Sequence, residues 1–151
     1  MREFDVIILG GGISGAMAGI ASSRLGAKTL IIESYGFLGG MLTAAGVGPM
    51  MTFHAGKKQA IQGITDEMIQ RLKKIGKSVG HIKDLTNYTY SITPFDSEAM
   101  KHELEMMLVE SGAEILYHTV LAEVIKEGSK ITKVKVCNKA GLSEISGKIF
   151  I

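Results

Sequence analysis

The feature that most constrains this chain is a run of glycines between two apolar segments near its start. Residues 4–34 read FDVIILGGGISGAMAGIASSRLGAKTLIIES, and the first half of this stretch places glycine at positions 10, 11, 12, 15 and 19. Glycine weakens helices and strands because its backbone has the most conformational freedom to lose on folding. Its repeated use where a strand pattern gives way to a helix pattern predicts that the backbone itself must approach something closely.

The pattern around the glycines predicts a strand, a helix and a second strand. Residues 4–9 form a nearly continuous apolar run, which is typical of a strand buried on both faces of a parallel sheet. Residues 13–25 have small and apolar side chains on one helix face, and Gly26 is expected to end that helix. Residues 28–33 form the second strand. Such a βαβ unit is right-handed, so its sheet is predicted to be parallel.

The next part of the chain predicts a long loop followed by an amphipathic helix. Residues 34–56 have no clean period and hold many glycines, so we interpret them as an extended loop with one short helix from Met41. A loop of this length inside a compact domain is usually functional. Residues 65–75 then have apolar side chains at helical spacing, and we expect Thr65 to cap this helix.

The second half of the chain predicts one more helix and then mostly strands. Residues 96–111 form a helix that Asp96 caps and Gly112 ends. Residues 114–117 form a third parallel strand. Turn signals then separate the three strands of an antiparallel β-meander, at residues 120–126, 130–138 and 142–150. Because the chain ends inside an apolar run, we expect a fragment that stops before the last parallel strand of its domain and leaves an exposed edge strand.

Composition argues against several classes of partner. The chain has 151 residues, of which 46% are hydrophobic and 21% charged, and its net charge is +2. This balance predicts one globular domain over residues 1–151 without a polyanion-binding surface, so nucleic acid is not expected as a partner. No apolar run approaches the ~18 residues of a membrane span, so a membrane is not expected either. Cys137 is the only cysteine, which excludes an internal disulfide and fits a reducing, cytoplasmic setting.

Gly10, Gly12 and Gly15 form a G-x-G-x-x-G motif directly after the first predicted strand. In that context the first glycine permits a tight turn, the second lets a pyrophosphate approach the backbone, and the third lets helix and strand pack closely. The start of the helix adds free N–H groups and a partial positive charge. The motif therefore predicts a dinucleotide-binding site.

Glu33 supports the same interpretation. It lies 18 residues after Gly15, at the end of the second predicted strand. A carboxylate at this position accepts hydrogen bonds from the ribose hydroxyls of adenosine, and it disfavours NADP because it would repel a 2′-phosphate. The alternative is a solvated acid at a strand end.

Two stretches resemble the N-terminal part of the FAD-dependent oxidoreductases of the glutathione-reductase-like flavoprotein superfamily: residues 5–33 (DVIILGGGISGAMAGIASSRLGAKTLIIE) and residues 34–47 (SYGFLGGMLTAAGV). In that family a Gly-Gly pair after the ribose-binding acid lets the chain pass close to the FAD pyrophosphate and ribityl chain. Gly39 and Gly40 match this pair, and Thr43 matches a position that is often polar. A plain loop turn is the alternative for the two glycines.

The resemblance extends over the rest of the chain. Residues 94–125 (PFDSEAMKHELEMMLVESGAEILYHTVLAEVI) are similar to the family segment that leads to a backbone contact with adenine, which by position is Val120. The implied fold is of the α/β class: a doubly wound, Rossmann-like FAD/NAD(P)-binding domain with a parallel sheet and an antiparallel β-meander. The family continues with an ATGD-like motif after the meander, beyond Ile151, so this fragment alone is expected to be inactive.

The predicted function follows from this resemblance. We expect the FAD-binding portion of a flavin-dependent oxidoreductase that transfers hydride or electrons to or from a small-molecule substrate, with NAD(P)H as a candidate electron donor in the full-length protein. A homo-oligomer is left open. The predicted cofactor-binding residues are Gly10, Gly12, Ile13, Ser14, Gly15, Glu33, Ser34, Gly39, Gly40, Met41, Thr43 and Val120.

Two other functions remain open: a non-catalytic nucleotide-binding or regulatory module, and a thiazole-synthase-like protein that holds an adenylated intermediate. The sequence identifies neither a substrate nor catalytic residues. His54, at the far end of the glycine-rich loop, is either a proton donor or attachment point near the flavin ring or a loop histidine without a special role. The four histidines have no metal-ligand spacing, so no metal is predicted.

Overall fold

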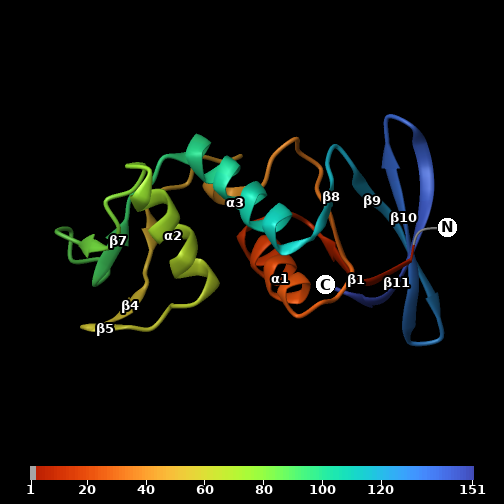
Figure 1. The fold of residues 1–151 in the computed structure, drawn as a ribbon, viewed down its shortest axis with the longest axis horizontal. Helices are drawn as coiled ribbons and strands as arrows, with labels where there is room; N and C mark the ends of the chain where they lie inside the picture. Colours follow the sequence, from red (N-terminus) through yellow and green to blue (C-terminus); the bar gives the residue numbers. More distant parts are fainter. Residues whose placement is uncertain (1–2) are drawn as a thin grey trace. The chain divides into compact units, whose positions relative to one another are not determined.

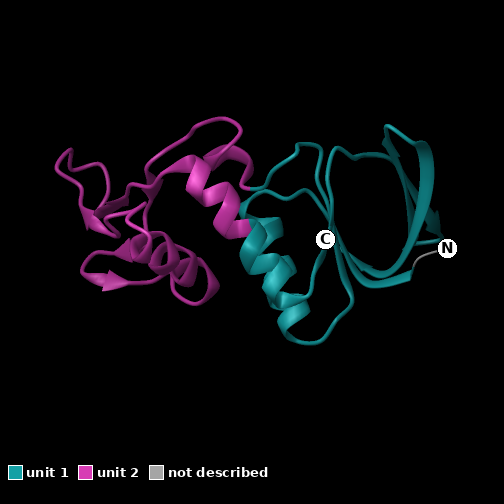
Figure 2. Cartoon of the chain, turned by 45° about the horizontal axis from the view of Figure 1, so that its top comes forward, with its two compact units in different colours: residues 1–38, 105–151 teal, residues 39–104 magenta. Residues whose placement is uncertain are grey.

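The computed structural model describes residues 3–151, and the chain divides into two compact units (Figure 1, Figure 2). Unit 1 comprises residues 1–38 and 105–151, and unit 2 comprises residues 39–104. That residues 1–151 form a single domain stays a prediction; in chain order, unit 2 lies between the two parts of unit 1. The boundary at residues 104 and 105 falls inside one helix, so no linker-like composition marks it.

Unit 1 contains the predicted βαβ unit and the predicted β-meander. Its helix and strands lie close to the expected boundaries, and they are β1 (Glu3–Leu9), α1 (Ile13–Arg24), β2 (Thr29–Ile32), β8 (Glu114–Leu116), β9 (Val120–Glu127), β10 (Lys130–Asn138) and β11 (Gly141–Phe150). The end of α3 (Ser97–Ser111) also belongs to this unit. The fold is of the α/β class with a parallel sheet and an antiparallel meander, as predicted.

All the strands of unit 1 join one sheet, in the order β8-β2-β1-β11-β10-β9. β1 lies between β2 and β11 and is parallel to both, and β11 is antiparallel to β10. Residues 142–150 form the predicted meander strand, and the second half of β11 is in addition the parallel neighbour of β1, a pairing that the sequence did not indicate. The expected exposed edge at the end of the chain is wrong for the same reason, since the edge strands are β8 and β9.

The two faces of the parallel strands are covered differently. A Cβ atom on Gly19 of α1 would lie 2.5 Å from Ile31 Cδ1 and 2.9 Å from Leu108 Cδ2, so α1 and the end of α3 pack closely on one face. The other face packs against the meander and forms a hydrophobic core with it. This core consists of Phe4, Ile7, Leu30, Ile32, Val134 and Val136.

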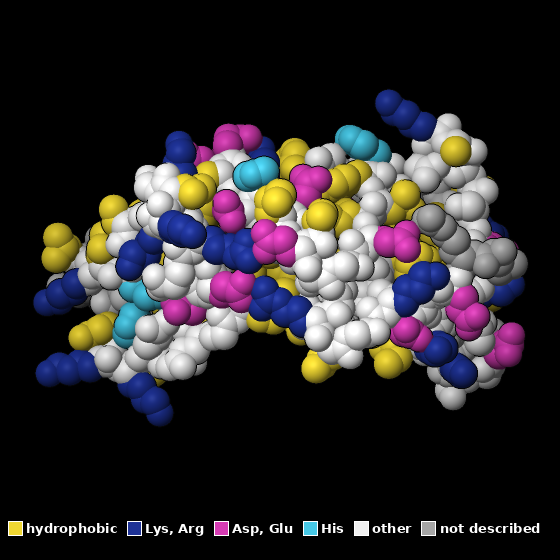
Figure 3. Space-filling view, in the orientation of Figure 1, with side chains coloured by type: hydrophobic (Ala, Val, Ile, Leu, Met, Phe, Trp, Pro, Cys, Tyr) yellow, Lys and Arg dark blue, Asp and Glu magenta, His cyan; other side chains and the backbone are white. Residues whose placement is uncertain are grey.

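Ion pairs on the outside of the strands join Lys133 to Glu144, Lys135 to Glu123 and Lys148 to Asp5. Lysines and acids alternate over this unit in Figure 3.

Unit 2 contains short elements, and the segment predicted as an extended loop has structure of its own. The elements are the 3₁₀ helix η1 (Gly40–Leu42), β3 (Met50–Met51), β4 (His54–Ala55), β5 (Lys58–Gln59), α2 (Ile64–Lys74), β6 (Ile82–Lys83), β7 (Ser91–Thr93) and the start of α3. The predicted short helix near Met41 corresponds to η1. β3, β7 and β6 form a three-stranded antiparallel sheet, and β4 pairs with β5.

The two predicted helix caps have different outcomes. Asp96 caps α3 as predicted, because its Oδ1 accepts hydrogen bonds of 3.0 Å from the N–H groups of Glu98 and Ala99. The prediction for Thr65 is wrong, because α2 begins at Ile64 with Gly63 at the cap position and no side-chain cap. Gly63 has a φ of 67°, a conformation that favours glycine and that sets the start of the helix earlier than expected. Among residues 3–151, no helix is long and apolar enough to cross a membrane.

A buried aspartate holds the loop between β6 and β7. Asp84 Oδ1 accepts hydrogen bonds from the Thr86 N–H at 2.8 Å and the Thr86 hydroxyl at 2.7 Å, and Oδ2 accepts from the N–H groups of Tyr88 at 3.0 Å and Thr89 at 2.8 Å. These hydrogen bonds, led by that of the Thr86 hydroxyl, lower the pKa of Asp84 to about 2.

We predict that Asp84→Asn destabilises the protein at neutral pH and that the difference from the wild type shrinks in acid. The folded pKa lies below the unfolded value of 3.8, so the carboxylate stabilises the folded state above about pH 4. This stabilisation is lost as the pH falls through the folded pKa of about 2. Urea unfolding at several pH values tests this. Leu85→Ala, at the exposed tip of the same loop, is the control and should have little effect.

Candidate functional site

The turn between β1 and α1 places three consecutive glycines in three different environments. Gly10 has a φ of 121°, and its N–H donates to the Ile32 carbonyl at 2.9 Å, so the chain turns sharply beside β2. A Cβ atom on Gly11 would collide with the Leu38 side chain. A Cβ atom on Gly12 would meet nothing within 4 Å. A Cβ atom on Gly10 would also meet nothing within 4 Å, but only Gly12 combines open space with a φ, −61°, that other residues adopt readily.

The open space at Gly12 lies at the N-terminus of α1. Gly12 is the cap residue of this helix, no side chain caps it, and its carbonyl accepts from the Ala16 N–H at 2.8 Å. The N–H groups of the first turn, from Ile13 to Gly15, therefore have no side-chain partner at the cap. A Cβ atom on Gly15 would collide with the Gly10 carbonyl oxygen, so this glycine allows α1 to pack against the turn.

Glu33 follows β2 directly and is buried, with 6% of its surface exposed. Its Oε2 accepts a hydrogen bond from the Gly11 N–H at 2.7 Å, while Oε1 accepts from the Tyr35 N–H at 2.8 Å and the Ser34 hydroxyl at 2.9 Å. A carboxylate has about four acceptor sites, so one site, on Oε2, remains. Sequence reasoning missed that most of this carboxylate is used within the protein.

A cleft of about 190 Å³ opens beside these groups, at the carboxyl ends of β1 and β2. In open α/β sheets ligands bind at this edge. The cleft is smaller than the 300–1,000 Å³ of most whole-ligand pockets, so it matches only part of a dinucleotide. Its lining residues are Leu9, Gly10, Ile32, Ser34, Thr119, Val120 and Leu121.

The structure brings together eight of the predicted cofactor-binding residues in unit 1. They are Gly10, Gly12, Ile13, Ser14, Gly15, Glu33, Ser34 and Val120. Sequence reasoning missed the contributions of Gly11 and Thr119 to the same region. Thr119 is buried and its N–H donates to the Glu33 carbonyl at 3.0 Å. The run of three consecutive glycines was the available signal for Gly11, whereas Thr119 carried none.

The other four predicted residues belong to unit 2. Gly39 and Gly40 have φ values of 105° and 52°, and a Cβ atom on Gly39 would lie 2.5 Å from Thr43 Cγ2. Both positions thus require glycine for local reasons. Thr43 is buried and Met41 is exposed. That these residues contact the cofactor stays a prediction.

Tyr117 is a further buried polar group near this region. No residue of the described chain is hydrogen-bonded to its hydroxyl. Burial, followed by the charges of Glu105 and Glu33, raises the pKa of Tyr117 to about 12. The phenol is therefore neutral at physiological pH and retains its proton for donation.

A parallel βαβ unit with a glycine turn, a buried acid after β2 and a cleft at the strand ends defines a dinucleotide-binding domain. More particularly, the chain belongs to the family of FAD dependent oxidoreductases, whose model matches residues 5–151. FAD is therefore its cofactor.

Similar proteins cover almost the whole chain. Digeranylgeranylglycerophospholipid reductase of Thermoplasma volcanium is 25% identical, over 100% of this chain and 39% of that protein. Thiamine thiazole synthase of Methanococcus aeolicus is 30% identical, over 93% of this chain and 49% of that protein. A crystal structure of a geranylgeranyl bacteriochlorophyll reductase-like protein from Thermoplasma acidophilum has a TM-score of 0.65 and 18% identity, over 99% of this chain and 38% of that one. The chain spans less than half the length of each.

We predict that Gly12→Val folds but loses affinity for ADP and FAD by about tenfold or more, which is about 1.4 kcal/mol. The new side chain enters the open space at the start of α1, where the pyrophosphate is expected. Calorimetry measures the affinity, and circular dichroism checks the fold.

Gly15→Val is the matched comparison in the same turn. Its side chain would collide with backbone, so it should lower the free energy of unfolding by about 1–3 kcal/mol, the usual cost of overpacking. Unchanged ADP affinity in a folded Gly12→Val variant would contradict the assignment of this turn.

Proposed function

We propose that this chain is the FAD-binding portion of an oxidoreductase that transfers hydride or electrons to or from a small-molecule substrate. The observation that carries the proposal is the open backbone at Gly12, next to uncapped N–H groups and a cleft at the strand ends. We also propose that NAD(P)H supplies electrons in the full-length protein. Neither nucleic acid nor a membrane-spanning segment is involved in this proposal. The protein would act in the cytoplasm, as a monomer or a homo-oligomer.

The residues of unit 1 fit an adenine dinucleotide. The N–H groups at Ile13 and Ser14 would hold the pyrophosphate, with Gly12 leaving the room that it needs. The remaining acceptor site on Glu33 Oε2 suits one ribose hydroxyl. Val120, at the mouth of the cleft, would contact the adenine through its backbone. When bound, FAD supplies the electron transfer, and the protein supplies binding and orientation.

A second function has specific support. The thiamine thiazole synthase of Methanococcus aeolicus is 30% identical to this chain, so a protein that holds an adenylated intermediate in the same cleft is the alternative. A non-catalytic nucleotide-binding module would also use the Gly12 turn. The visible spectrum separates these functions: oxidised flavin that copurifies with the protein absorbs blue light and supports the oxidoreductase. Retention of a nucleotide without flavin would support either alternative and overturn the proposal.

We predict that Glu33→Gln weakens binding of ADP and FAD by about 1–3 kcal/mol, the scale for hydrogen bonds to a charged group. The glutamine loses the ribose acceptor and turns an amide N–H₂ toward the donors that now face the carboxylate. FMN lacks the adenosine ribose and should bind equally well to both forms. Calorimetry with the three ligands measures this.

Asp5→Asn is the control for this prediction. Asp5 is a carboxylate of β1 in the same unit, and its partners are the Lys28 N–H and Lys148 Nζ. Because it is not one of the predicted cofactor-binding residues, its loss should change ADP affinity much less than Glu33→Gln does. Equal losses for ADP and FMN in Glu33→Gln would mean that the variant disturbs the turn as a whole instead of removing a ribose contact.

A further inference from the structure

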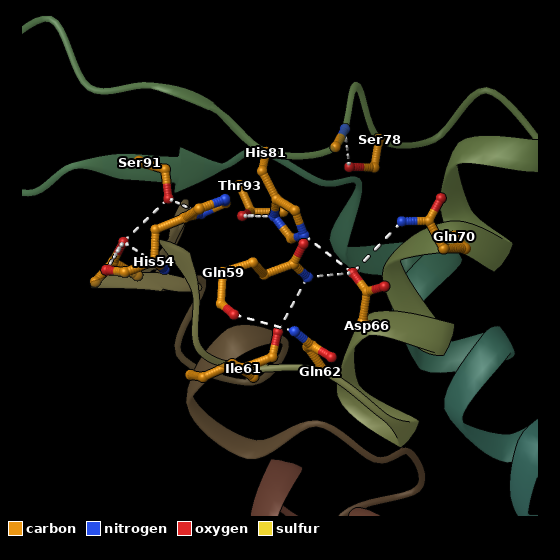
Figure 4. A network of polar contacts seen from close by, with 12 residues as sticks. His54, Gln59, Ile61, Gln62, Asp66, Gln70, Ser78, His81, Ser91 and Thr93 are labelled. Carbon is orange, nitrogen blue, oxygen red and sulfur yellow. Dashed lines mark hydrogen bonds and ion pairs between the residues drawn. The ribbon is translucent and has the colours of Figure 1, made fainter. Parts of the chain in front are cut away.

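The four histidines of the chain have two kinds of environment. In unit 2, hydrogen bonds hold the rings of His54 and His81 in a polar network (Figure 4). His102, on α3, and His118, after β8, are exposed, and within residues 3–151 neither of these two rings has a hydrogen-bond partner. Of the two, only His118 belongs to unit 1, which contains the cleft at the strand ends.

His118 lies in the connection between β8 and β9. Its N–H donates to the Tyr35 carbonyl at 3.1 Å, and the N–H of the next residue, Thr119, donates to the Glu33 carbonyl at 3.0 Å. These two hydrogen bonds hold the connection alongside the segment that follows β2. Ser34, which lies between the two acceptors, lines the cleft together with Thr119. His118 is therefore beside the cleft.

The backbone of His118 is in an uncommon conformation. Its φ is 50°, in the left-handed region that residues other than glycine adopt rarely. Such positions cost free energy, and they cluster at ligand-binding and active sites. The hydrogen bonds of residues 118 and 119 to the segment after β2 maintain this conformation. The backbone thus indicates a functional position.

The ring of His118 packs on the backbone of Gly36. A Cβ atom on Gly36 would lie 2.7 Å from Cε1 and 2.8 Å from Nε2 of His118, so a larger residue would displace the ring. The rings of Tyr35 and Phe37 stack with their centroids 5.5 Å apart, so these two side chains share one side of the segment. Ser34 and Gly36 alternate with them and face the other side. The ring of His118 is therefore on the side of Ser34, which lines the cleft.

The order of groups in an adenine nucleotide places the base near this ring. The pyrophosphate is expected at Gly12 and the ribose at Glu33, so the base, which follows the ribose, lies beyond Glu33 toward Ser34 and the connection. The edges of adenine carry both hydrogen-bond donors and acceptors. A neutral imidazole ring has one donor and one acceptor nitrogen, and those of His118 are both free within the described chain.

We propose that His118 is a further nucleotide-binding residue, whose ring forms a hydrogen bond with the adenine base in this cleft. Gly36 is the positioning residue, because it leaves room for the ring. The inference rests on the proposed function, since it needs an adenine nucleotide in the cleft. The sequence pattern identified neither His118 nor Gly36 as a site residue.

NMR spectra of the histidine ring protons report the contact directly. The ring current of a bound adenine shifts the Cε1–H and Cδ2–H signals of a ring that it touches, whereas ribose 5-phosphate has no such current. We expect ADP to shift the signals of His118 and to leave those of His102 in place, with His118→Asn and His102→Asn to assign them. His118 signals that do not move at saturating ADP, or that move equally with ribose 5-phosphate, would overturn the proposal.

Two variants test the contribution of the ring to affinity. His118→Asn removes the ring but keeps a residue that adopts a positive φ readily, and Gly36→Ala keeps the ring but displaces it. Each should weaken ADP binding by about fivefold, the scale of one hydrogen bond, and leave FMN binding unchanged. His102→Asn is the matched control and should leave both affinities unchanged.

The double variant tests whether the two residues act through one contact. Because both changes remove the same hydrogen bond, the double variant should bind ADP no more weakly than His118→Asn alone. Calorimetry measures the affinities, and circular dichroism checks the fold. Wild-type ADP affinity in a folded His118→Asn variant, or additive losses in the double variant, would contradict the proposal.

Gly12→Val and the visible spectrum keep this inference separate from the proposed function. ADP binding that is lost in Gly12→Val but unchanged in His118→Asn would count against the His118 contact alone. The expected shifts of His118 with ADP, in a protein that retains no flavin, would count against the oxidoreductase alone.

Discussion

The hydrogen bond from the Gly11 N–H to Glu33 Oε2, at 2.7 Å, is the contact on which the arrangement of unit 1 depends. It joins the glycine turn after β1 to the end of β2, in a buried place where an unpaired carboxylate would be costly. The N–H of Tyr35 and the hydroxyl of Ser34 donate hydrogen bonds to Glu33 Oε1 and so stabilise the buried charge further. The turn and the acid are therefore one structural element, although 22 residues separate them.

This contact also explains why the turn needs a glycine that the nucleotide motif leaves unspecified. A Cβ atom on Gly11 would lie 3.0 Å from Glu33 Oε2 and would collide with Leu38. Gly10 is required by its positive φ, and Gly12 by the space that it leaves open. Three neighbouring glycines thus meet three separate requirements: conformation, close approach and access.

Local sequence patterns predicted most of unit 1. The apolar run at residues 4–9 became β1 and the small-residue pattern became α1, because each signal depends on neighbours within a few residues. The cap of α3 by Asp96, in unit 2, was predicted for the same reason. The role of β11 was not predictable in this way. Its alternation identifies a strand, but no local pattern reveals that its second half pairs with β1. Cleft residues such as Thr119 likewise depend on pairing between distant segments.

The structure of unit 2 was harder to predict from the sequence, because it too depends on contacts between distant segments. Its strands are two or three residues long, which is too short for a period to emerge from the sequence. Its polar network joins residues far apart in the chain, with 37 positions between His54 and Ser91 and 15 between Asp66 and His81. The sequence therefore left His54 with two interpretations, and only its partners in the fold distinguish its two ring nitrogens.

The position of β11 beside β1 has a consequence for synthesis. β1 is translated before the other strands of this sheet, and its partner on one side, residues 146–150, is translated after them. The Asp5–Lys148 ion pair, which spans 143 residues, forms at the same late stage. While the residues between these two strands are translated, one side of β1 is thus an open, apolar strand edge, the kind of surface on which nascent chains pair wrongly or recruit chaperones. β1 lies inside the sheet, yet β11, which pairs with one of its sides, is the last strand of this sheet to be translated.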